Sequence, residues 1–78
     1  MSNPLTEGVE YSIQHLYGQV KDGGLKADSS FVESMVGLYR MIGVRGEQAI
    51  KNMLDFAKEK KLADLEETVA HVALIHGW

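Results

Sequence analysis

Apolar residues recur every three or four positions through most of the chain, which is the spacing of one face of an α-helix. Four such stretches are separated by short segments that are polar or contain glycine. The first is predicted to begin at Asn3-Pro4 and to end near Lys21-Asp22, just before Gly23-Gly24. Its predicted inward positions are Leu5, Val9, Ile13, Leu16 and Val20.

The second stretch runs from about Phe31 to Ile42 and is apolar around nearly half of its circumference. Ser30 and Glu33 have the spacing of a capping box at its start, and Gly43 is expected to end it. A helix with so wide an apolar face must be covered from two sides. Its predicted inward positions are Phe31, Val32, Met35, Val36, Leu38, Tyr39 and Ile42.

The third helix is predicted from about Gly46 to Lys61, and a capping box of Asp64 and Glu67 is predicted to open the fourth. Fusion of these two helices into one bent rod is an alternative, because Leu62-Ala63 contains no strong helix breaker. The predicted inward positions are Ala49, Ile50, Met53, Leu54, Phe56 and Ala57 in the third helix, and Leu65, Val69, Val72, Ala73 and Ile75 in the fourth.

Short connections favour antiparallel packing of consecutive helices. The longest one precedes the second helix and contains Leu25, which is expected to turn back onto the core. The predicted fold class is therefore all-α, a compact bundle of four short helices with the second and third helices central. Residues 1–78 are expected to form a single helical domain, because so short a chain supports only one core.

Composition narrows the possible functions further. With 45% apolar and 24% charged residues the chain is typical of a globular domain, and without cysteine it has neither disulfides nor thiolate metal ligands. The net charge is −3, whereas nucleic-acid binders usually carry a concentrated basic face. No apolar run has membrane-spanning length, and the sequence from Met1 to Pro4 does not resemble a signal peptide, so a cytoplasmic location is expected.

One alternative interpretation of residues 38–54 is a DNA-binding helix-turn-helix. Under that hypothesis Arg45, Lys51 and Lys58 should share one exposed face. The acidic net charge and the carboxylate of Glu47, which would repel phosphate, count against it. Nucleic acid is therefore an unlikely partner on sequence grounds.

A second alternative is a helical module that binds a metal or a small ligand. Glu67 and His71 lie four residues apart and can face the same ion, but a metal site needs three or four ligands. An ordinary surface pair explains this spacing equally well. No cysteine, paired nucleophile or phosphate-binding loop accompanies His71 or His76, so no catalytic residue, cofactor site or metal site is predicted and the protein is not expected to be an enzyme.

Several large apolar residues fall off the predicted inward faces and are interpreted as partner-binding residues. They are Tyr11, Met41, Leu74 and Trp78. For Trp78, folding back over the end of the bundle is the favoured alternative, since a chain this small needs its large apolar groups. Tyr39 and Met53 are expected in the core. The sequence thus predicts a small regulator, inhibitor or adaptor, of the kind found in bacteria or phages, that forms a homodimer and binds another protein.

Overall fold

The computed structural model describes residues 4–78, which form four α-helices and no strand. Asn3, the predicted cap of the first helix, lies outside the described residues. The helices are α1 (Pro4–Lys21), α2 (Ser29–Met41), α3 (Gly46–Glu59) and α4 (Ala63–His76). The predicted all-α bundle is confirmed.

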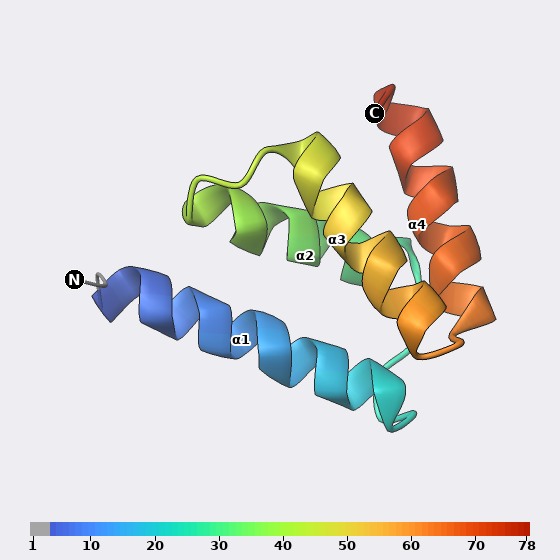
Figure 1. The fold of residues 1–78 in the computed structure, drawn as a ribbon, viewed down its shortest axis with the longest axis horizontal. Helices are drawn as coiled ribbons and strands as arrows, with labels where there is room; N and C mark the ends of the chain where they lie inside the picture. The colour runs from blue at the N-terminus through green and yellow to red at the C-terminus, as the bar shows by residue number, and fades with distance from the viewer. Residues whose placement is uncertain (1–3) are drawn as a thin grey trace.

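Helix α2 packs against each of the other three helices. Figure 1 shows α1 along one side of α2, with α3 and α4 side by side toward the other edge of the molecule. The backbone of α1 approaches only α2, but the ring of Tyr17 in α1 reaches Phe56 in α3, with 4.2 Å between the ring centroids. Helices α2 and α3 therefore each contact the other three helices, as the width of their apolar faces predicted.

The core is apolar except for one pair of hydroxyl groups. The hydroxyls of Tyr17 and Tyr39 form a buried hydrogen bond of 2.8 Å that joins α1 to α2. Burial raises the pKa of both tyrosines above the ordinary value of 10.0; for Tyr39, hydrogen bonds with Tyr17 and Asn52 offset part of this rise. The buried core residues are Val9, Ile13, Tyr17, Val20, Phe31, Val32, Met35, Val36, Tyr39, Ala49, Ile50, Met53, Ala57, Leu65, Val69, Val72 and Ala73.

Three predicted inward residues are exposed instead. Leu5 is 58% exposed because α1, with 18 residues, is longer than the 13-residue α2 on which it packs, so its first turn overhangs. Leu25 is 37% exposed and does not join the core. Ile75 is 66% exposed because, at helical pitch, it lies about 100° from the centre of the buried face of α4.

The cap of α2 differs from the predicted one. Asp28 is the N-cap residue, and its Oδ1 accepts a 2.9 Å hydrogen bond from the backbone N–H of Phe31. The helix consequently begins at Ser29, one residue before the predicted capping residue Ser30, and Ser30 lies in its first turn. Glu33, the other half of that predicted box, forms a 2.6 Å contact with Nε2 of His76 and so links α2 to the end of α4.

Helices α3 and α4 are separate, as predicted, but the end of α3 and the cap of α4 differ from the prediction. Helix α3 ends at Glu59, and Lys61 has a left-handed backbone with φ of 58°. The N–H of Leu62 then donates to the carbonyl of Ala57 at 2.8 Å, which closes α3 and excludes one continuous rod. Helix α4 begins at Ala63 without a side-chain cap, so the capping box predicted from Asp64 does not form.

Replacing Lys61 with glycine is expected to raise the free energy of unfolding by about 0.5–1 kcal/mol, because a side chain at positive φ is strained and glycine is not. The same change at Lys60, where φ is −92°, should lower it by a similar amount, since there glycine only adds freedom to the unfolded chain. The exposed 3.7 Å contact of Lys60 with Glu59 adds little to this difference. Urea denaturation of both variants measures the effect, and equal destabilisation by both would contradict it.

Candidate protein-binding surface

The four predicted partner-binding residues lie on different parts of the fold. Tyr11 is 73% exposed on α1, Met41 is 58% exposed at the end of α2, and Leu74 is 80% exposed on α4. Trp78 follows α4 and is 36% exposed. The ring of Tyr11 stacks on that of His15 in the same helix, and the ring of Trp78 stacks on that of His76. The residue that belongs to a larger exposed apolar group is Leu74.

Trp78 folds back onto the start of α3. A Cβ atom added at Gly46 would lie 2.6 Å from Cζ2 of the indole, so the ring covers the backbone there directly. Gly77 turns the chain with φ of 74°, and the N–H of Trp78 donates to the carbonyl of Ala73 at 2.8 Å. Trp78 therefore folds back over the end of the bundle, which is the alternative favoured from the sequence.

Helix α4 carries apolar residues on both its inner and its outer side. Leu65, Val69, Val72 and Ala73 are buried, whereas Ala70, Leu74 and Ile75 are exposed. We call these three exposed residues the apolar end of α4. Exposed apolar side chains of this size are typical of an interaction surface.

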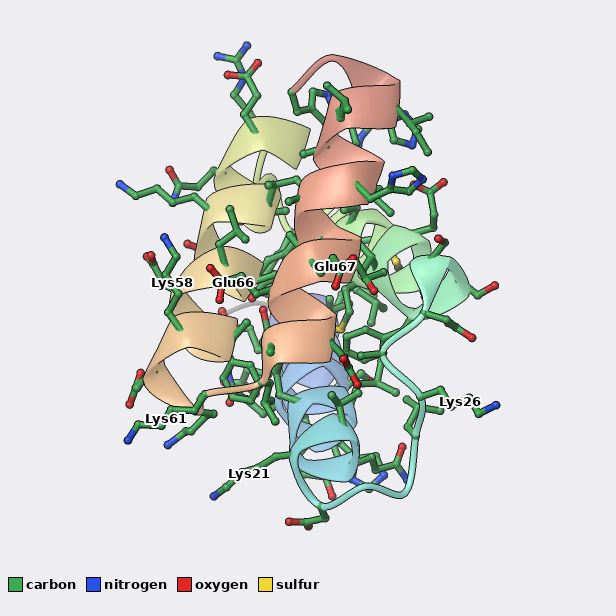
Figure 2. The ribbon with its side chains drawn as sticks, turned by 90° about the vertical axis from the view of Figure 1, so that its right-hand side faces the viewer. Lys21, Lys26, Lys58, Lys61, Glu66 and Glu67 are labelled. Atoms are coloured by element: carbon green, nitrogen blue, oxygen red, sulfur yellow. The ribbon has the colours of Figure 1, made fainter. Side chains whose placement is uncertain are left out.

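The beginning of α4 is acidic. Asp64, Glu66 and Glu67 lie in its first five residues, and the helix contains neither lysine nor arginine. Carboxylates are favoured there by the helix dipole. Figure 2 shows Glu67 on the outer side of α4, turned away from the core, and Glu66 on the side toward Lys58. The exposed side of α4 thus changes from acidic to apolar along its length.

An open groove of about 1050 Å³ adjoins this acidic beginning. One wall is the connection between α1 and α2, and the other is the outer side of α4. The two walls are joined by a 2.9 Å hydrogen bond from Oγ1 of Thr68 to the carbonyl of Ala27. The lining residues are Val20, Leu25, Lys26, Ala27, Asp28, Ser29, Lys61, Leu62, Ala63, Asp64, Leu65, Glu67, Thr68 and His71.

The residues of the two alternative hypotheses are placed as follows. Glu67 and His71 both line the groove, but within residues 4–78 no group of three or more His, Cys, Asp or Glu side chains is arranged to hold a metal ion. Lys51 and Lys58 lie on one exposed face of α3 by helical pitch, whereas Arg45 precedes the helix as its N-cap residue, about 120° away. No specific observation favours either alternative.

Sequence reasoning missed Ala70, Ile75 and Leu25 as surface residues. The signal for Ile75 was present, because Leu65, Val69 and Val72 define a face that Ile75 does not share. For Leu25 no such signal exists, since a connection without helical period does not tell which way a side chain points.

Comparison of the chain with protein-family models, with curated proteins and with solved structures found no match. None of the helices within residues 4–78 has the length and apolar character needed to cross a bilayer.

Proposed function

We propose that this protein is a small regulatory or adaptor protein that acts by binding another protein through the apolar end of α4. The observation that carries the proposal is the exposure of Leu74 and Ile75, at 80% and 66%, on a helix whose inner side is already fully used by the core. Covering two large aliphatic side chains removes apolar surface from water, which is the main driving force of protein association.

The predicted homodimer remains a prediction. Packing α4 against α4 of a second copy would bring together helices whose only formally charged residues are carboxylates, with no lysine or arginine to offset them. A dimer would therefore use another face, such as the exposed side of α1 that carries Tyr11. Light scattering at several protein concentrations tests self-association separately from binding of a different protein.

The proposal is tested with three immobilised baits: the wild type, a Leu74→Ser/Ile75→Ser variant and a Tyr11→Ser variant. Because all three positions are exposed, each bait should fold, and circular dichroism checks that it does. We expect a partner from an extract of the source cells to be retained by the wild type and by Tyr11→Ser, and lost with the double variant. Identical retention on all three baits, or none on the wild type, would overturn the proposal.

A further inference from the structure

The groove beside α4 has walls that are held in place by the fold itself. The bond from Thr68 to Ala27 ties the connection to α4, and the carboxylate of Asp28 is occupied in capping α2. Pre-formed concave sites bind with a smaller loss of conformational entropy than sites that must be ordered by the ligand. The groove is therefore a more favourable place for an extended contact than the flat sides of the bundle.

The interior of the groove offers apolar contact. Val20, Leu25 and Leu62 line it, and the side chain of Leu25 is 37% exposed. An apolar side chain placed against these three residues would be removed from water, and so would the surfaces of the three residues that it covers. The groove thus provides an anchor position for one apolar side chain of an occupant.

The charges of the groove are arranged unequally. Asp64 and Glu67 line the α4 wall, whereas Lys26 and Lys61 belong to the connections on either side of it. Figure 2 shows Lys26 and Lys61 extending from opposite sides of the molecule, away from Glu67. A cationic group next to α4 would meet the two carboxylates first, and complementary charge of this kind orients a partner.

The α4 wall of the groove continues directly into the apolar end of α4. At helical pitch His71 follows Glu67 on the same side, and Leu74 and Ile75 follow His71 one turn further on. A segment that lies along α4 would therefore pass from an acidic region with an apolar pocket to an exposed apolar region. Amphipathic segments commonly bind grooves in this way.

We propose that the groove and the adjoining side of α4 receive a basic amphipathic segment of the partner protein. One apolar side chain of that segment contacts Leu25, Val20 and Leu62, and its lysines or arginines pair with Asp64 and Glu67. This inference rests on the proposed function, because it names the chemistry of the partner that the apolar end of α4 contacts.

The test uses two labelled peptides of the same length, one built from leucine and lysine and one with glutamate in place of every lysine. Fluorescence anisotropy measures their binding to the wild type and to four variants, Glu67→Lys, Leu25→Ser, Glu10→Lys and Leu74→Ser/Ile75→Ser. Glu10 is exposed on α1, so Glu10→Lys is matched to Glu67→Lys in charge but lies outside the groove.

We expect the lysine peptide to bind the wild type at least about tenfold more tightly than the glutamate peptide, and Glu67→Lys and Leu25→Ser each to weaken it about tenfold. Glu10→Lys should change its affinity less than about twofold. Equal weakening by Glu10→Lys and Glu67→Lys, equal binding of the two peptides, or no binding of either would overturn the inference.

The remaining variant separates this inference from the proposed function. If both peptides bind alike and only Leu74→Ser/Ile75→Ser weakens their binding, the proposal that the apolar end of α4 binds a partner is supported. The proposal that the partner segment is basic is then contradicted. If Glu67→Lys and Leu25→Ser weaken the lysine peptide but Leu74→Ser/Ile75→Ser does not, the groove binds a basic segment and the apolar end of α4 is not its contact.

Discussion

Replacing Leu65 with alanine is expected to lower the free energy of unfolding by about 2–5 kcal/mol. Leu65 is completely buried in the first turn of α4, and alanine would leave a cavity that the surrounding side chains fill only partly. A domain of this size has a total stability of about 4–12 kcal/mol, so this one change removes a large part of it. Urea denaturation followed by circular dichroism at 222 nm, a helix signal, measures the loss.

The matched control for this prediction lies on the same helix. Leu74→Ala removes the same atoms from a side chain that is 80% exposed, and it should change the free energy of unfolding by less than about 0.5 kcal/mol. A loss at Leu74 as large as that at Leu65 would mean that α4 is covered on its outer side in the isolated protein, for example by a second copy. That outcome would contradict the exposure of the outer side of α4.

Raising the pH above 10 is expected to destabilise the fold through Tyr17 and Tyr39. Burial raises the pKa of both phenols in the folded protein, whereas in the unfolded chain they ionise near 10.0. The folded state therefore holds more protons above pH 10, and stability must fall as the pH rises. The effect is fully absent below pH 9 and amounts to about 1.4 kcal/mol per pH unit for each tyrosine that stays protonated in the fold.

Urea denaturation at intervals from pH 8 to pH 12 measures this dependence. The control is the Tyr17→Phe/Tyr39→Phe variant, which keeps both rings but removes the two buried hydroxyls together and leaves neither unpaired. All other side chains are the same in both proteins, so the difference between the two curves isolates Tyr17 and Tyr39. If the variant loses stability as steeply as the wild type above pH 10, the buried hydroxyl pair is not the cause.

The sequence predicts the helices well because apolar residues recur at a regular spacing over the whole length of each one. The wide apolar faces of α2 and α3 place Met35, Tyr39 and Met53 in the core, and all three are buried. Helix ends are predicted less well. Ser30 and Asp64 each have an acidic residue three positions later, yet only the local backbone decides whether a cap forms, and Asp28 and Leu62 are the N-cap residues that the fold selects.

The candidate surface is predictable only in part. Leu74 can be assigned to the outside of α4 from helical pitch alone, and it is exposed. The groove cannot be predicted, because it depends on contacts between segments far apart in the sequence, such as Thr68 with Ala27. Trp78 illustrates the same limit, since its position against Gly46 is set by the turn at Gly77 and by the approach of α3.

The attachment of α1 to a single backbone neighbour has a consequence for how the molecule opens. The helix held by the fewest packed neighbours detaches at the lowest free energy, so α1 should peel away while α2, α3 and α4 remain assembled. Val20, near the end of α1, lines the groove, so detachment of α1 would remove part of that lining. An occupant that binds the intact groove therefore stabilises the state in which α1 is attached. Binding of the occupant and detachment of α1 oppose each other through thermodynamic linkage.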